Sequence, residues 1–126
     1  KTHYDFFNKL IKFFITPNVN RNVKTNFLAY PIILKEKNKF TRKELQIYLE
    51  RNNIQTRPIF SGNILRHPAF SSLISKKNKL NKFKGADYIM RNGLLIGCHQ
   101  GLSKKDIFYI QSVILNFINS KEIVKK

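Results

Sequence analysis

The fold is decided by one stretch of sequence, Thr56-Arg57-Pro58-Ile59-Phe60-Ser61-Gly62-Asn63-Ile64-Leu65-Arg66-His67-Pro68-Ala69-Phe70. It begins as the end of a predicted strand. Pro58 fixes its own φ and keeps Arg57 extended, while Gly62 permits a sharp bend. Pro68 disfavours a helix across Arg66 and His67, so we predict that the chain leaves regular structure in this arginine loop (residues 56–70).

The arginine loop carries polar groups suited to an anionic, hydroxyl-rich ligand. Guanidinium groups offer a planar fork that matches phosphate, and the imidazole, amide and hydroxyl groups add further hydrogen bonds. The candidate binding residues are Arg57, Ser61, Asn63, Arg66 and His67. We expect Phe60, Leu65 and Phe70 to pin the loop against a core. The structural alternatives are solvated arginines, Asn63 capping the turn and His67 packed beneath Phe70.

Hydrophobic spacing predicts the elements that precede the loop. An amphipathic helix is expected to end at Pro17, with a hydrophobic stripe formed by Tyr4, Phe7, Leu10, Ile11 and Phe14. It begins without a cap, as if the chain started partway along a longer helix. A strand follows over 27–34, where Pro31 favours an edge position or an irregularity. The Thr41–Glu44 capping box begins a second helix that ends at Asn52-Asn53, and a short strand covers 54–59.

After the loop, residues 71–84 read as a lysine-rich connection with a helical turn around Leu73 and Ile74. A short helix over 86–91 ends at Asn92-Gly93, and a strand follows over 94–97. Ser103 caps the last helix, whose stripe is Ile107, Ile110, Val113, Ile114 and Phe117. The order of elements predicts a small α+β domain, with a three-stranded sheet covered by helices.

Charge dominates the composition, with 24 Lys+Arg against 7 Asp+Glu and a formal net charge of +17. The excess favours partners that carry phosphate, so a basic nucleic-acid-binding domain is the alternative interpretation. Its strongest support is the cluster of Lys76, Lys77, Lys79, Lys82 and Lys84. The sequence lacks zinc-ligand spacing, an aromatic RNA-binding signature and a GXXG loop, which argues against nucleic acid.

No local motif assembles a catalytic or metal centre, because Walker, GxGxxG and HExxH patterns are missing and the three histidines lie far apart in sequence. We expect Cys98 to be a small buried hydrophobe and His99 to be structural. A single cysteine excludes an internal disulfide and suits a reducing compartment, so a cytoplasmic location is expected. We expect neither a membrane span nor a secretory signal, since no apolar run is long enough.

The run IQTRPIFSGNILRHPAF over 54–70, followed by GADYIMRNGLLIGCHQGLSKKDIFYI over 85–110, resembles the C-terminal small domain of the DegT/DnrJ family of pyridoxal-phosphate enzymes. Within the family it is most similar to the NDP-4-keto-6-deoxyhexose 3-dehydratases, where Thr-Arg, Phe-x-Gly-Asn, Arg-x-Pro and an aromatic residue recur in this order. The resemblance covers residues 27–118. It divides the chain into the end of an interdomain helix (1–17), a small α+β domain (18–120) and a basic tail (121–126).

The resemblance implies the last third of a homodimeric fold-type-I enzyme that acts on nucleotide-linked keto sugars in lipopolysaccharide and related polysaccharide synthesis. Pyridoxal phosphate and the catalytic lysine (aminotransferases) or histidine (dehydratases) would belong to an N-terminal large domain. We therefore expect no catalytic residue and no cofactor held by this chain alone. The motif favours the dehydratases. Arg57 and Arg66 would contact the diphosphate or the cofactor phosphate, and Ser61, Asn63 and His67 the sugar.

Overall fold

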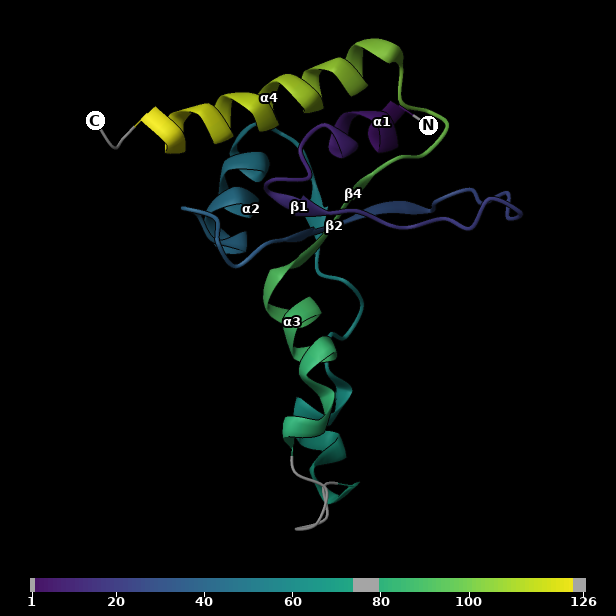
Figure 1. The fold of residues 1–126 in the computed structure, drawn as a ribbon, viewed down its shortest axis with the longest axis vertical. Helices are drawn as coiled ribbons and strands as arrows, with labels where there is room; N and C mark the ends of the chain where they lie inside the picture. The colour runs from purple at the N-terminus through teal and green to yellow at the C-terminus, as the bar shows by residue number, and fades with distance from the viewer. Residues whose placement is uncertain (1, 74–79, 124–126) are drawn as a thin grey trace.

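The computed structural model describes residues 2–73 and 80–123, which form an α+β domain around a four-stranded antiparallel sheet. The strand order is β1-β2-β4-β3, with bounds Phe14–Ile15, Ala29–Leu34, Gly93–Gly97 and Thr56–Arg57. Helices α1 (Thr2–Asn8), α2 (Arg42–Arg51) and α4 (Lys104–Ile123) lie on one side of the sheet, and α3 (Lys84–Asn92) extends from the other (Figure 1). The predicted fold class is confirmed.

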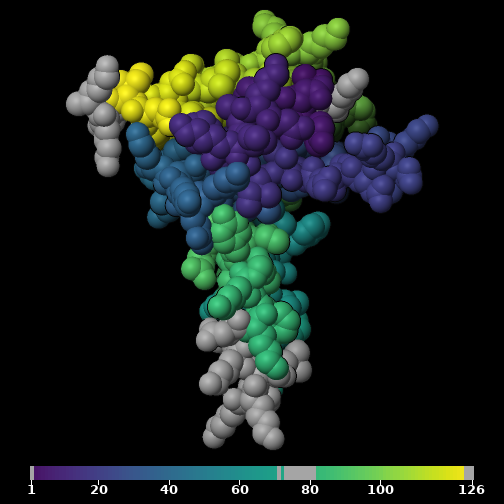
Figure 2. All heavy atoms as spheres, in the orientation of Figure 1, coloured from purple at the N-terminus to yellow at the C-terminus, as the bar shows by residue number. Residues whose placement is uncertain are grey.

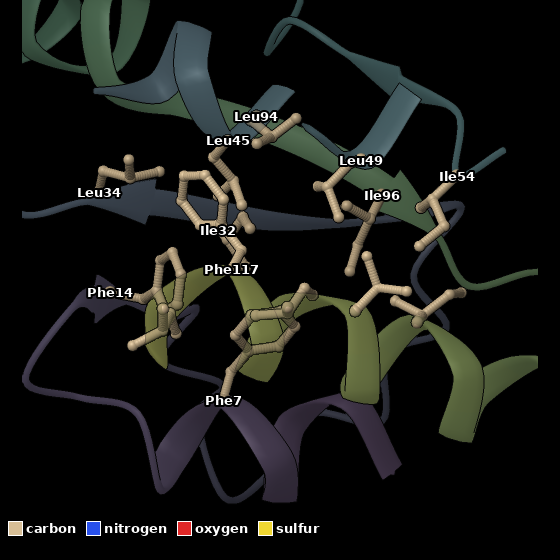
Figure 3. Close-up of a cluster of buried hydrophobic side chains, with 14 of the residues drawn as sticks. Phe7, Phe14, Ile32, Leu34, Leu45, Leu49, Ile54, Leu94, Ile96 and Phe117 are labelled. Atoms are coloured by element: carbon tan, nitrogen blue, oxygen red, sulfur yellow. The ribbon is translucent and has the colours of Figure 1, made fainter. Parts of the chain in front are cut away.

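The core lies between the sheet and the helices on its covered face (Figure 3). Alternate residues of β2 are buried, as expected for a strand with one face against a core. They meet Leu94 and Ile96 of β4 and the buried stripe of α4. Among the described residues, the largest fully buried side chains are Phe7, Phe14, Ile32, Leu34, Leu45, Leu49, Leu94, Ile96 and Ile114.

Two helices begin where the capping residues predict. The Glu44 amide donates to Thr41 Oγ1 at 3.2 Å, and the Thr41 amide donates to Glu44 Oε2 at 2.8 Å. Ser103 and Asp106 repeat the same pair of bonds at the start of α4. These reciprocal bonds satisfy backbone donors that have no partner inside the helix.

The first helix is shorter than predicted and the sheet has one more strand. α1 ends at Asn8, and the Leu10 amide then donates to the Phe7 carbonyl at 2.9 Å in a tight turn. Phe14 still reaches the core, because Phe14 and Ile15 pair with Leu34 and Ile33 as β1. Ile11 of the predicted stripe is 59% exposed. The backbone groups of Phe14 and Ile15 form hydrogen bonds with β2 in place of the hydrogen bonds of the predicted helix.

Of the two alternatives predicted for Pro31, the edge position is wrong, because β2 is an interior strand. The contradiction has a local explanation. β1 pairs only with Ile33 and Leu34, so at Pro31 the strand has a neighbour on the β4 side alone. The missing N–H of proline is tolerated where one side of a strand is unpaired.

The arginine loop is more regular than predicted. It contains the 3-10 helix Ile64–Arg66, and a second one, Pro68–Leu73, begins at the proline, where a missing N–H is harmless. His67 between them is extended, as the residue before a proline should be. Phe60 is 87% exposed, so it does not pin the loop as expected.

The loop, the 3-10 helix Leu80–Phe83 and α3 form a narrow arm that projects from the body (Figure 2). Lys76, Lys77, Lys79 and the predicted turn at Ile74 fall outside the described residues. At the other end of the chain, α4 continues to Ile123 and includes Lys121, the first residue of the predicted tail. No helix in the described ranges is long and apolar enough to cross a bilayer.

Candidate anion-binding site

Asp87 on α3 connects the arginine loop to α3 through hydrogen bonds and an ion pair. Arg66 donates through Nε and Nη2 to the two carboxylate oxygens of Asp87, and Asn63 Nδ2 donates to Asp87 Oδ1 at 2.7 Å. Asp87 is only 5% exposed. The Arg66 guanidinium, followed by the Asn63 amide, holds the pKa of Asp87 well below its usual range. Asp87 is therefore a charged carboxylate at neutral pH, and Arg66 is its counterion.

Both polar atoms of the Asn63 side chain form hydrogen bonds within the domain. Its Oδ1 accepts from the Leu65 amide at 3.1 Å and caps the 3-10 helix Ile64–Arg66, while its Nδ2 holds Asp87. The residue is 3% exposed. Asn63 thus acts as a cap and a tether in this structure, and its contact with a sugar stays a prediction.

His67 closes the bend that precedes it. Its Nε2 lies 2.8 Å from the Ser61 carbonyl oxygen, and because a carbonyl only accepts, Nε2 is the donor. Gly62 between them has φ +64°, and a Cβ at that position would stand 2.6 Å from Met90 Cγ. Glycine is required here both by conformation and by the close approach of α3.

A pocket of about 430 Å³ opens beside this tether. Its lining is Arg42, Arg66, Asp87, Met90 and Arg91, so it brings three arginines together with one aspartate. Arg42 Nε donates to the Arg91 carbonyl oxygen at 3.0 Å, which joins the start of α2 to the end of α3. The Arg91 guanidinium has no hydrogen-bond partner among the described residues. The geometry and charge of this arginine pocket suit a phosphate or diphosphate.

The structure brings only one of the two predicted arginines to this pocket. Arg57 lies on the edge strand β3, is exposed, and does not line it. Arg42 and Arg91 were missed by sequence reasoning, since they lie on α2 and α3, away from the loop in sequence. Neither the capping box next to Arg42 nor the Asn92-Gly93 signal next to Arg91 points to a ligand.

Lysine, histidine, cysteine and carboxylate side chains are the ones that would hold pyridoxal phosphate or a metal ion. Pyridoxal phosphate is held by an imine to a lysine in many enzymes, and no lysine is among the described residues that line three of the best-formed pockets. These three linings do not fit a covalently held cofactor. Within residues 2–73 and 80–123, no group of three or more His, Cys, Asp or Glu side chains is placed to hold a metal ion.

The helix-covered antiparallel sheet is a fold found in part of the chain of fold-type-I pyridoxal-phosphate enzymes. The family predicted from the loop motif is confirmed. The chain belongs to the DegT/DnrJ/EryC1/StrS aminotransferase family, which it matches over residues 4–115.

Individual relatives support the same assignment. The chain is 29% identical over 106 residues to the lipopolysaccharide biosynthesis protein RfbH of Salmonella typhimurium, covering 84% of this chain and 24% of RfbH. It is 33% identical over 79 residues to the dTDP-4-dehydro-2,6-dideoxy-D-glucose 3-dehydratase of Saccharopolyspora spinosa, covering 63% and 17%. The chain thus spans a quarter or less of these curated relatives.

A solved structure shows the same fold. The Escherichia coli GDP-4-keto-6-deoxy-D-mannose-3-dehydratase with bound hydrated PLP superposes with a TM-score of 0.71 at 25% sequence identity. The match covers 89% of this chain and 28% of the E. coli chain. The chain therefore matches one part of the E. coli enzyme.

Proposed function

We propose that this chain is the C-terminal, substrate-holding domain of a nucleotide-sugar 3-dehydratase that uses pyridoxal phosphate in the synthesis of cell-surface deoxysugars. The observation that carries the proposal is the family match over residues 4–115, together with an arginine pocket at the base of the family's loop motif. The relatives at 29% and 33% identity bear names from lipopolysaccharide biosynthesis and sugar 3-dehydration. Dehydration is therefore favoured over amino transfer.

The role proposed for the chain is binding and orientation. Arg42 and Arg91 would contact the diphosphate of the nucleotide sugar, and Asp87 would hold Arg66 at the pocket wall. A charge-assisted hydrogen bond to phosphate contributes about 1.5–3 kcal/mol. Binding energy from the nucleotide end can orient the reacting sugar, so this domain would influence turnover as well as affinity.

Arg57, Ser61, Asn63 and His67 remain predicted substrate contacts. Of these, Arg57 and Ser61 have exposed side chains and are the ones open to a ligand as the chain stands. A cofactor-bearing large domain, a homodimeric enzyme and a cytoplasmic location complete the proposal. The free thiol of Cys98, half-buried and donating to the Phe27 carbonyl at 3.0 Å, suits a reducing compartment.

Calorimetric titration with inorganic pyrophosphate, dTDP and GDP tests the binding role. Arg91→Ala is expected to weaken dTDP and GDP about tenfold or more, because one charge-assisted contact is lost. Arg51→Ala is the matched control, since Arg51 is an exposed arginine at the end of α2 that does not line the pocket. Equal losses in the two variants would mean that only net charge matters, and the site would be refuted.

Two further measurements separate this proposal from its rivals. Borohydride reduction after incubation with pyridoxal phosphate should trap no stoichiometric lysine adduct, and such an adduct would contradict a domain that is catalytically incomplete alone. Duplex DNA binding should be lost at physiological salt, because scattered lysines give only screened attraction. Tight DNA binding that persists there would favour the nucleic-acid alternative.

A further inference from the structure

The most exposed aromatic side chain of the described residues lies in the arginine loop. Phe60 is 87% exposed, against 64% for Phe108 and 48% for Tyr109. A ring that stays in water on almost every side buries little apolar area, so it contributes little to the stability of the fold.

Phe60 also has a strained backbone conformation. Its φ is +45°, and Asn53 is the only other non-glycine residue with a positive φ in the described part of the chain. The Gly62 amide donates to the Ile59 carbonyl at 3.1 Å, so Phe60 is the first central residue of a turn over 59–62. A positive φ at this turn position is normally taken by glycine, asparagine or aspartate, and it is costly for a bulky side chain.

The turn is held in place without the Phe60 ring. His67 Nε2 donates to the Ser61 carbonyl oxygen at 2.8 Å, and Asn63 Nδ2 donates to Asp87 Oδ1 at 2.7 Å. Among the described side chains of the arm (Figure 2), no hydrophobic one is buried. Backbone strain persists where the surroundings fix the chain, and it gathers at ligand-binding sites. The fold therefore does not need a phenylalanine at position 60.

The turn lies beside the arginine pocket. Gly62 approaches Met90 so closely that a Cβ would stand 2.6 Å from Met90 Cγ, and Met90 lines the pocket. Ile59 approaches Gly93 in the same way, since a Cβ at Gly93 would stand 2.6 Å from Ile59 Cδ1. Phe60 comes between Ile59 and Gly62 in the chain. Its backbone therefore lies next to the last turn of α3, which supplies part of the pocket lining.

An exposed aromatic ring beside a cluster of arginines suits a ligand with a flat ring at one end and phosphate at the other. A nucleotide has this form, and its base can stack on an aromatic side chain. Arg57 and Ser61, close to Phe60 in the chain, are exposed and carry groups that hydrogen-bond a base or a ribose. We propose that Phe60 stacks on the base of a nucleotide whose diphosphate lies in the arginine pocket. This inference rests on the proposed function and assigns the contact for the nucleoside end of its substrate.

Tryptophan fluorescence tests the contact directly. The protein contains no tryptophan, so Phe60→Trp places a single indole at the proposed contact in the full chain. Titration with GDP or dTDP should quench its emission saturably, because the base stacks on the indole. Inorganic pyrophosphate should bind without quenching, since it has no ring. Phe108→Trp is the matched control, because Phe108 is an exposed residue of α4 outside the pocket, and its emission should not show saturable quenching.

Calorimetry and urea unfolding separate the ring from the backbone. Phe60→Leu should weaken GDP and dTDP about tenfold or more and leave pyrophosphate unchanged, whereas Phe60→Tyr should keep the wild-type affinity, because stacking needs only the aromatic face. Phe60→Gly should weaken the nucleotides to the same extent as Phe60→Leu. It should also raise the urea midpoint, because glycine adopts a positive φ without strain.

Three outcomes would overturn the inference. The first is equal quenching of Phe60→Trp and Phe108→Trp, and the second is an unchanged nucleotide affinity in Phe60→Leu. In either case the proposed function stands if Arg91→Ala still weakens GDP and dTDP. The third is a lower urea midpoint for Phe60→Gly, which would mean that the ring serves the fold. If neither the nucleotides nor pyrophosphate bind the wild-type chain, the proposed function and the inference both fall.

Discussion

Replacing Gly62 by alanine tests the central structural claim, that a glycine lets the arginine loop bend tightly against α3. The residue has φ +64°, a backbone conformation that residues with a Cβ rarely adopt. A Cβ there would lie 2.6 and 2.7 Å from Met90 Cγ and Cβ, and 3.2 Å from its Cα. The substitution therefore introduces a backbone penalty and a steric penalty at once.

The two penalties have separable magnitudes. Forcing alanine into the left-handed region costs about 1–2 kcal/mol, and overpacking a contact costs about 1–3 kcal/mol. We expect Gly62→Ala to lower the free energy of unfolding by about 2–5 kcal/mol, the sum of both. Met90 is 38% exposed, so Met90→Ala alone should have a small effect. In that background Gly62→Ala should cost less than in the wild type, because the contact with Met90 Cγ is gone, but more than the backbone part of about 1–2 kcal/mol, because alanine keeps the Cβ 2.7 Å away.

Urea unfolding of the wild type, Gly62→Ala, Met90→Ala and the double variant measures the coupling free energy between positions 62 and 90. Gly85→Ala is the control, because a Cβ at Gly85, in α3, would meet no atom of the described residues within 4 Å. It should be neutral or stabilising by up to about 1 kcal/mol. A Gly62→Ala protein within about 0.5 kcal/mol of the wild type would refute the reasoning, and a cycle with no coupling would refute its steric part.

Three other predictions concern the helix caps, the tether and the core. Lys121 donates to Glu44 at 2.6 Å and, with Thr41, lowers the pKa of Glu44 from 4.5 to about 2. The ionised Glu44 carboxylate therefore stabilises the fold fully above pH 4.5, and this stabilisation is lost as the pH falls to about 2. In urea unfolding measured across this pH range, Glu44→Gln should remove the loss of stability that comes from protonating Glu44. Asp87→Asn should lower the thermal midpoint but tighten pyrophosphate binding in calorimetry, because it releases the Arg66 guanidinium; weaker pyrophosphate binding would contradict the pocket. Ile114→Ala removes a fully buried side chain from α4 and should lower the free energy of unfolding by about 2–5 kcal/mol in urea; a loss typical of surface positions would contradict the core described above.

The elements with local signals were predicted well. The Thr41 and Ser103 caps, the left-handed Asn53 at φ +57° and the stripe of α4 appear where the sequence places them. Each depends on contacts within about one helical turn, and such contacts are visible in the order of residues. The failures lie where distant parts of the chain compete. The helix predicted up to Pro17 gave way to β1, because β2 offered its backbone an alternative partner.

The candidate site divides in the same way. The loop motif predicted the family, since the motif consists of residue types at fixed spacing. The contact of Arg66 with a phosphate stays a prediction. The pairing of Arg66 with Asp87, which lies in a different element, was not predictable from the loop alone. The same holds for Arg42 and Arg91, which reach the pocket from two helices.

The sequence by itself determined the family, the α+β class and the arginine-bearing loop, because spacing, caps and prolines act locally. Only the tertiary structure decided which charges face one another. It placed Asp87 against Arg66 and left Arg57 on the sheet edge. The physical reason is that hydrogen bonds and ion pairs depend on distances of a few ångströms between residues far apart in the chain, and folding alone sets those distances.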